Sequence, residues 1–206
     1  MIFKAEPYLY NQKDKDSSLK INAYNIRFNN GILICPQTLY YLIIGSYSKS
    51  IENISSIYQK LILNNEERIG FKAITQLLNT IRVYTKSNPA LFITPHIFTK
   101  FISLLWDKNV DEKSYRNILK LFKEDFSYIQ EEDIKKEVLI ELDNFRNKVF
   151  GISEASLSIL KNRRSHPSII SSSPKVLMEY NDDFLYVDFN ELTRFIKEDE
   201  RRNSII

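Results

Sequence analysis

The chain has 206 residues, 43% hydrophobic and 27% charged, a balance typical of an ordinary globular protein and not of a disordered or fibrous one. Its 29 basic and 26 acidic residues leave a net charge of +3, which is too even for the overall positive surface of a dedicated nucleic-acid binder. A single cysteine excludes an internal disulfide, and no apolar run approaches the ~20 residues that span a bilayer, so we expect a soluble, intracellular, cytoplasmic protein without membrane contact.

Residues 1–49 are expected to form a β-hairpin and a short helix. Within residues 19–36, two β-prone runs flank the Asn-Asn-Gly sequence at 29–31, and these residue types tolerate the positive φ angles of tight hairpin turns. Pro36 suits the first position of a helix. The apolar run that follows predicts a short buried helix, which we expect to stop at Gly45.

Residues 50–164 are expected to be helical, because apolar residues recur there at spacings of three and four. Two helix starts are predicted from capping residues: Thr94, which is followed by Pro95, and Asp111. The clearest helical pattern covers residues 131–149, with acidic residues in its first turn and basic residues in its last turn.

The last part of the chain returns to a strand pattern. Residues 165–174 are rich in serine and proline and have the composition of a linker. In residues 175–206 we expect a second β-hairpin, with its turn at residues 181–183, and a closing helix capped by Asn190.

These elements predict an α+β fold that is predominantly α-helical, with six to seven helices flanked by an N-terminal and a C-terminal β-hairpin. Isolated two-stranded hairpins are marginal in water, so we expect the two hairpins to share one small sheet packed on the helices. The four segments 1–49, 50–164, 165–174 and 175–206 then form one compact domain.

Few residue types suited to catalysis or cofactor binding are present. The four glycines are scattered singly and form no phosphate-binding loop. Structural zinc requires four Cys or His ligands, whereas the chain offers only Cys35, His96 and His166. Cys35 lies in an apolar run, which is typical of a buried, inert thiol. We therefore expect no cofactor.

Three acidic residues are the remaining candidates for metal-dependent chemistry. Asp182, Asp183 and Asp188 surround the predicted C-terminal hairpin and are the kind of ligands that divalent cations prefer. However, aspartates at positions 182 and 183 are also what a tight turn favours. A metal-dependent enzyme is therefore only a remote alternative.

A basic group near the end of the helical region suggests contact with nucleic acid. Its members are Arg146, Lys148, Lys161, Arg163 and Arg164, and the flexible segment that follows them could track a phosphate backbone. Basic residues at helix C-termini are also expected from the helix dipole alone. A nucleic-acid-binding accessory protein is the alternative function that this group supports.

Tyrosines expected to be exposed favour contact with protein. Tyr8, Tyr10, Tyr40 and Tyr41 add apolar surface beyond what short helices and hairpins bury easily, and tyrosine is favoured at interfaces. We therefore expect a non-enzymatic subunit or adaptor that acts through protein–protein contacts, including self-association.

Overall fold

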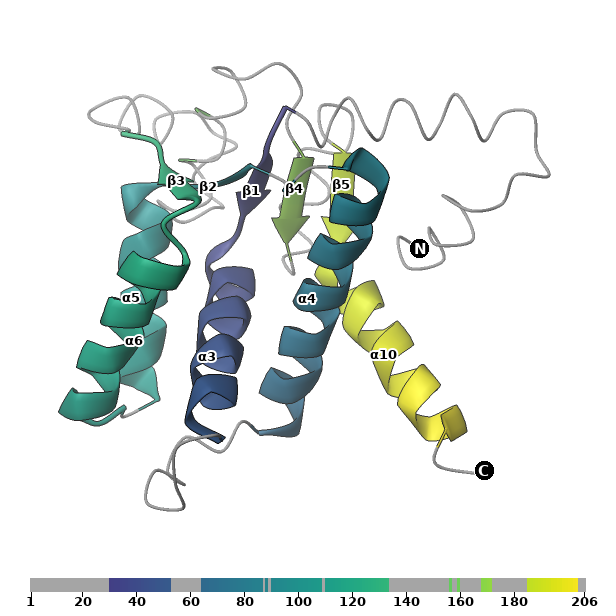
Figure 1. The fold of residues 1–206 in the computed structure, drawn as a ribbon, viewed down its shortest axis with the longest axis horizontal. Coiled ribbons are helices and arrows are strands. Elements are labelled where there is room, and N and C mark those ends of the chain that lie inside the picture. The colour runs from purple at the N-terminus through teal and green to yellow at the C-terminus, as the bar shows by residue number, and fades with distance from the viewer. Residues whose placement is uncertain are drawn as a thin grey trace, which may run out of the picture.

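The computed structural model describes residues 30–52, 64–86, 88, 90–108, 110–133, 156, 159, 168–171 and 185–203. Within these residues the chain forms five helices and five short strands (Figure 1). In chain order they are β1 (Ile32–Ile34), α3 (Pro36–Glu52), α4 (Asn65–Thr85), β2 (Leu91–Ile93), α5 (Pro95–Asp107), α6 (Glu112–Asp125), β3 (Ile129–Glu131), β4 (Ser168–Ser171), β5 (Leu185–Asp188) and α10 (Phe189–Asn203). The protein is thus a mixed, mostly helical structure, as the composition and periodicity predict.

The strands form one parallel sheet in the order β3-β2-β1-β4-β5, which Figure 1 shows from left to right. Each of the four pairings is parallel. In the central strand, Ile32 is in register with Leu91 of β2 on one side and with Ser168 of β4 on the other. Parallel neighbours cannot be joined by a tight turn, so α3 and α4 connect β1 to β2, and α5 and α6 connect β2 to β3.

The predicted N-terminal hairpin is therefore wrong for β1. Both edges of this strand are occupied by parallel neighbours, which leaves no edge for an antiparallel partner from residues 19–29. Gly31 does have the positive φ that the sequence predicts, 104°, but it precedes the central strand, and the ring of Phe92 packs against it. The first strand of the C-terminal hairpin lies outside the described residues, whereas β1 and β5 do belong to one sheet.

Four residues of the segment predicted as a linker form β4 instead. Ser168, Ile169, Ile170 and Ser171 are all buried, and the strand lies between β1 and β5. The amide of Ser168 donates a hydrogen bond to the carbonyl of Gly31 at 2.9 Å, and the amide of Cys35 donates one to the carbonyl of Ile170 at 3.2 Å. Two of the serines that suggest a linker by composition, Ser168 and Ser171, are thus part of the core.

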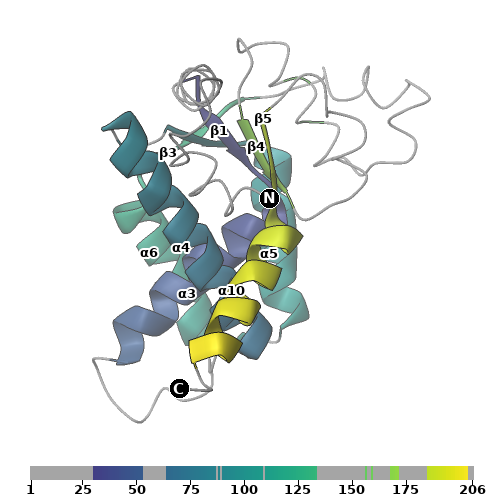
Figure 2. The same cartoon turned by 90° about the vertical axis from the view of Figure 1, so that its right-hand side faces the viewer.

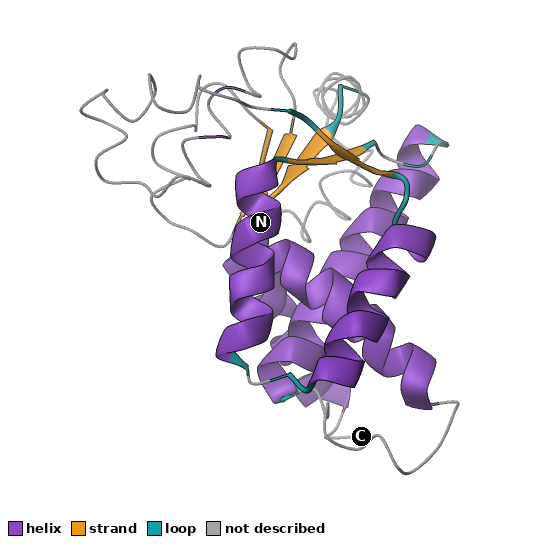
Figure 3. Ribbon diagram, turned by 90° about the vertical axis from the view of Figure 1, so that its left-hand side faces the viewer, coloured by secondary structure: helices purple, strands orange, loops and turns teal. Residues whose placement is uncertain are grey.

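The helices lie mainly beyond the carboxyl ends of the strands, below the sheet in Figures 1 and 3. The central helix is α3, which contacts α4, α5 and α6 and is buried on nearly every side. This confirms the buried helix predicted from the apolar run after Pro36. The last helix, α10, packs against α4 (Figure 2). The described helices number five, not the predicted six to seven, because the prediction also counted helices in residues 53–63, which lie outside the described residues, and in residues 134–162, of which only Ser156 and Ile159 are described, both as helical.

α3 does not stop at Gly45 but continues to Glu52. The reason for the glycine is close packing, because a Cβ atom at Gly45 would lie 2.1 Å from Cγ of Phe71 on α4. The contact is reciprocal: a Cβ at Gly70 of α4 would lie 2.7 Å from the ring of Tyr41 on α3. Each helix thus receives an aromatic ring of the other where its own side chain is missing.

Two of the three helix starts predicted from capping residues are as expected, whereas α10 begins at Phe189, so that Asn190, its predicted cap, is already the second helical residue. Thr94 caps α5 by accepting a hydrogen bond from the amide of Ile97, with Pro95 as the first helical residue. Asp111 caps α6 by accepting from the amide of Ser114 at 3.0 Å. Both predicted starts are confirmed. The helix predicted from residue 131 does not begin there, because Glu131 is the last residue of β3.

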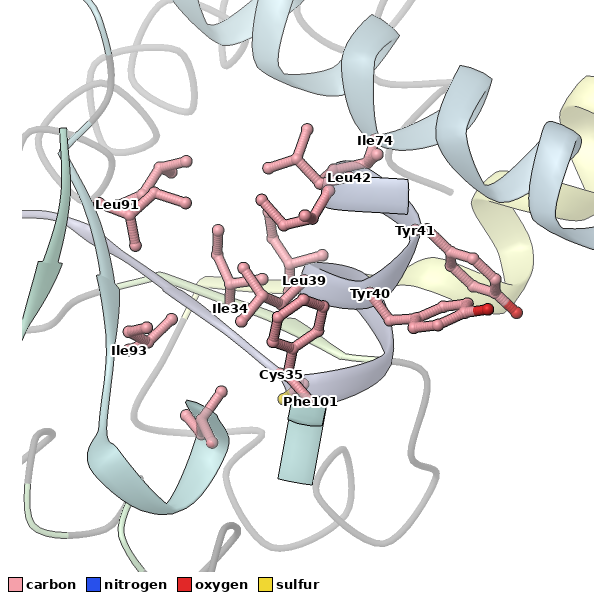
Figure 4. Close-up of a cluster of buried hydrophobic side chains, with 14 of the residues drawn as sticks. Ile34, Cys35, Leu39, Tyr40, Tyr41, Leu42, Ile74, Leu91, Ile93 and Phe101 are labelled. Carbon is pink, nitrogen blue, oxygen red and sulfur yellow. The ribbon is translucent and has the colours of Figure 1, made fainter. Parts of the chain in front are cut away.

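The hydrophobic core lies between the sheet and the helices, around α3. Figure 4 shows Ile34, Leu39, Leu91, Ile93 and Phe101 gathered between β1, β2, α3 and α5. In the described part of the chain, no helix is long and apolar enough to cross a membrane.

Candidate functional site

The carboxyl edge of the sheet is where open parallel sheets usually bind ligands, at the point where strand order reverses. Here that point lies between β1 and β4. The described residues at these strand ends are Cys35 after β1, Thr94 after β2 and Ser171 in β4, all of them buried. The hydroxyls of Thr94 and Ser156 form a hydrogen bond of 2.6 Å. This part of the edge is therefore packed with small, neutral side chains.

Cys35 is 5% exposed and is not part of a disulfide. It lies between β1 and α3, with its backbone amide bonded to β4. Thiol chemistry requires access to a thiolate, so burial at this position favours the inert role that the sequence predicts.

The three predicted acidic ligands are not brought together by any described contact. Asp188 is the last residue of β5, while Asp182 and Asp183 lie outside the described residues. Within the described ranges, no three His, Cys, Asp or Glu residues are grouped closely enough to hold a metal ion.

The predicted basic group cannot be placed. Its five members, Arg146, Lys148, Lys161, Arg163 and Arg164, all lie outside the described residues, as do Tyr8 and Tyr10. Contact of these residues with nucleic acid or protein stays a prediction.

Tyr40 and Tyr41 are buried, not exposed as the sequence suggests. They are 3% and 6% exposed, and their rings project together from α3, with the hydroxyls on one side (Figure 4). Tyr41 also stacks on Phe189 of α10, with ring centroids 5.6 Å apart. The expectation failed because α4 and α10 cover a helix that is apolar all round.

The two tyrosine hydroxyls donate hydrogen bonds to carboxylates of adjacent residues in α4. Tyr40 donates to Glu67 at 2.9 Å and Tyr41 donates to Glu66 at 3.1 Å. Burial, assisted by the neighbouring Glu67, raises the pKa of Tyr40 well above its usual range, and burial likewise raises the pKa of Tyr41 to about 12. Both tyrosines therefore stay protonated near neutral pH and act as fixed hydrogen-bond donors.

Glu67 is the centre of a small polar network. It is 8% exposed, forms a reciprocal capping box with Asn64 and pairs with Lys108 at 3.1 Å. The network connects the start of α4 to α3 and to the end of α5. The hydrogen bonds and the ion pair compensate this carboxylate for its burial.

The most exposed large apolar side chain among the described residues is Trp106, the only tryptophan of the chain. It is 65% exposed near the end of α5, and its ring centroid lies 5.5 Å from that of Tyr115 on α6. Charged residues surround this pair in sequence, including Asp107, Lys108 and Glu112. We call Trp106 and Tyr115 the aromatic pair.

The sequence contained a signal for this exposure. The apolar stripe of residues 95–107 is Ile97, Phe98, Phe101, Leu104 and Leu105, which is a single helix face. Trp106 follows directly after that face, so helical periodicity places it outside the stripe.

Two cavities of about 610 and 600 Å³ open between the described elements. The first lies between α3, α4 and α10, and the second between α3, α4, the start of β2 and the end of α6. Both are in the size range of small-molecule sites.

Comparison of the chain with protein-family models, with curated proteins and with solved structures gives no match.

Proposed function

We propose that this protein is a non-enzymatic subunit or adaptor that acts by contacting another protein, with the aromatic pair at the centre of its contact surface. The observation that carries this proposal is the 65% exposure of Trp106 in a protein whose other described large apolar residues are mostly buried. Exposing an indole to water is unfavourable, and an interface would remove that cost.

The chemistry of the aromatic pair fits a protein interface. Tryptophan and tyrosine are enriched among the residues that dominate binding energy, and such residues are surrounded by a polar rim. Here the ring of Tyr115 is half-buried and supports the indole from α6, while Arg116 and Glu112 form an ion pair on the same helix. Trp106 is thus held on rigid helices and can insert into a partner at low entropic cost.

The packing of the carboxyl edge of the sheet supports a binding role. Cys35 and Thr94 occupy positions where an α/β enzyme would place reacting groups, yet both are buried. Thr94 is already bonded to Ser156 and to the start of α5.

Photo-crosslinking from position 106 tests the proposal. A photoreactive amino acid replaces Trp106 in one variant and Lys123, an exposed residue of α6, in a matched control. We expect position 106 to yield one dominant crosslinked protein in the native cell, either a second copy of the chain or a distinct partner, and position 123 to yield none. Equal, diffuse crosslinking from both positions would contradict the proposal.

Tryptophan fluorescence gives an independent readout, since all indole emission comes from Trp106. If the partner is a second copy, the emission moves to shorter wavelength as the protein concentration rises, in parallel with the mass measured by light scattering. If the partner is the distinct protein identified by crosslinking, its addition causes the same shift. An emission maximum that stays at the water-exposed position throughout would argue against the aromatic pair as the contact.

A further inference from the structure

We infer that the 610 Å³ cavity between α3, α4 and α10 is a binding site for a small organic anion. This cavity, hereafter the α10 cavity, is distinct from the aromatic pair. It is lined by Gln37 and Tyr41 from α3, by Glu66 from α4, and by Asn190, Arg194 and Lys197 from α10, among others.

The position of the α10 cavity is the first argument. Gln37 lies three residues after the end of β1, and Asn190 lies two residues after the end of β5. In the sheet, only β4 separates these two strands. The cavity is therefore at the carboxyl side of the sheet, beside the reversal of strand order, where open parallel sheets bind their ligands.

The charges facing the α10 cavity are the second argument. Arg194 and Lys197 are exposed and lie three residues apart, so they are neighbours on one face of α10. Neither forms an ion pair or hydrogen bond with any other described residue, unlike Glu200 one turn further on, which pairs with Arg68 and Lys72. Two cations side by side repel each other, and an anion between them would relieve that repulsion.

The remaining lining residues suggest an organic body attached to the anionic group. Glu66 is the one acidic residue in the lining, and it already accepts the hydroxyl of Tyr41. The side-chain amide of Gln37 already hydrogen-bonds with Tyr41 and has further polar atoms for a ligand, and Phe189, Tyr41 and Ile69 supply apolar wall. A carboxylate or phosphate ester on a small ring matches this combination of two cations, amides and apolar surface.

Ligand-dependent thermal shifts test this site, with phenyl phosphate and benzoate as anionic probes and benzamide as a neutral probe of the same shape. Binding to the native state raises Tm in proportion to occupancy. We expect at least one anion to raise Tm in a concentration-dependent manner and benzamide to have no effect. Inorganic phosphate, tested alongside, reveals how much of the affinity needs the ring.

Substitutions locate the site. Arg194→Gln and Lys197→Gln should each raise the Kd for the anion about tenfold, which is the scale of one charged hydrogen bond. The double variant should abolish the rise in Tm that the anion causes. The control variant, Lys100→Gln with Arg202→Gln, removes one exposed lysine and one exposed arginine that do not line the cavity, and should bind as the unmodified protein does. Melting in the absence of ligand verifies that all variants fold.

The inference is overturned if no anion shifts Tm at millimolar concentration, if benzamide acts as strongly as benzoate, or if the double variant and the control lose the same amount of binding. These outcomes are independent of crosslinking at position 106, so either proposal can fail alone.

Discussion

The ring of Phe71 on α4 occupies the space that a side chain at Gly45 of α3 would need, since a Cβ there would lie 2.1 Å from Cγ of Phe71 and 2.5 Å from its Cβ. These atoms are at the base of the Phe71 side chain and cannot move aside without moving α4. The distance between the two most extensively packed helices is therefore set by a glycine in the middle of a helix.

Replacing Gly45 by alanine should destabilise the protein. The gain in helix propensity, ~1 kcal/mol, is outweighed by overpacking, and we expect a net loss of about 1–2 kcal/mol in the free energy of unfolding. Urea denaturation measures it, with Asn117→Ala on the exposed face of α6 as the control. A second substitution, Phe71→Ala, should remove part of the penalty of Gly45→Ala, because it deletes the ring atoms at 2.1 and 2.2 Å but keeps the Cβ atom at 2.5 Å. Full additivity of the two substitutions would contradict the packing argument.

Glu200 should make folding stability sensitive to acid. Its hydrogen bonds with Arg68, at 2.8 and 2.9 Å, and with Lys72, at 2.9 Å, lower the pKa of the carboxyl from 4.5 to about 2. Because the folded-state pKa is below the unfolded one, this stabilisation is complete above about pH 4.5 and is lost as the pH falls towards 2.

The partners of Glu200 are about half exposed, so we expect Glu200→Gln to cost only about 1 kcal/mol at pH 7 and almost nothing near pH 2. Urea titrations at several pH values measure the difference, and 1 M salt at pH 7 should reduce it. Glu198→Gln on the same helix is the control. A cost that stays constant from pH 7 to pH 2 would show that the charge of Glu200 is not responsible.

Tyr40 and Tyr41 differ in how exposed their carboxylate partners are. Tyr40→Phe leaves the buried Glu67 without one of its donors, and we expect a loss of about 1–3 kcal/mol. Tyr41→Phe leaves the exposed Glu66, which water can solvate, and should cost less than about 1 kcal/mol. Urea denaturation at pH 7 compares the two variants directly. The reverse order of costs would mean that the Glu67 network contributes little to stability.

Ionisation of Tyr41 should lower the free energy of unfolding at high pH. The folded-state pKa of Tyr41, about 12, is above the ordinary value of 10, so the stabilisation from its protonated hydroxyl is complete below pH 10 and lost as the pH rises towards 12. Tyr41→Phe should therefore flatten the decline of stability above pH 10, measured by urea titration. In an absorbance titration of this variant, the contribution of one tyrosine that ionises at unusually high pH should also be missing. An unchanged alkaline profile would exclude this role for Tyr41.

Cys35 should report on unfolding. With the thiol 5% exposed, we expect labelling by a disulfide reagent to be slow in the native protein and fast in urea. If only global opening exposes the thiol, the labelling rate should fall as a stabilising condition is applied and rise in Gly45→Ala. Rapid stoichiometric labelling without denaturant would show that the edge between β1 and α3 is open.

Helix starts were predictable because capping is local. Thr94 accepts a hydrogen bond from an amide three residues along the chain, and Asp111 does the same, so residue type and spacing suffice to locate them. Strands were harder. β2 and β4 are buried on both faces, so they lack the alternation of apolar and polar residues by which a strand is recognised. In the sequence, β2 is followed almost directly by the apolar residues of α5, so the two are hard to separate. The serines of β4 are typical of a linker and not of a buried strand.

The candidate sites show the same division. Periodicity separates Trp106 from its helix's apolar face, so the aromatic pair has a sequence signal in its first member. Nothing local brings Gln37, Glu66 and Arg194 to one cavity, because they come from three helices that follow or precede different strands. Exposure of Tyr40 and Tyr41 could not be judged either, since it depends on which helices cover α3.

The sequence by itself determined the helical faces, the capped helix starts and the burial of the run after Pro36, because each depends on residues within a few positions of one another. Only the tertiary structure decided that β1 pairs in parallel with β2 and β4, both of which follow it far later in the chain, and not with an adjacent hairpin strand. Parallel pairing needs long connections, and closing them costs conformational entropy. For β1 and β2 this cost is offset only when α3 and α4 pack together, through Gly45 and Gly70. That compensation arises between elements, and no local pattern records it.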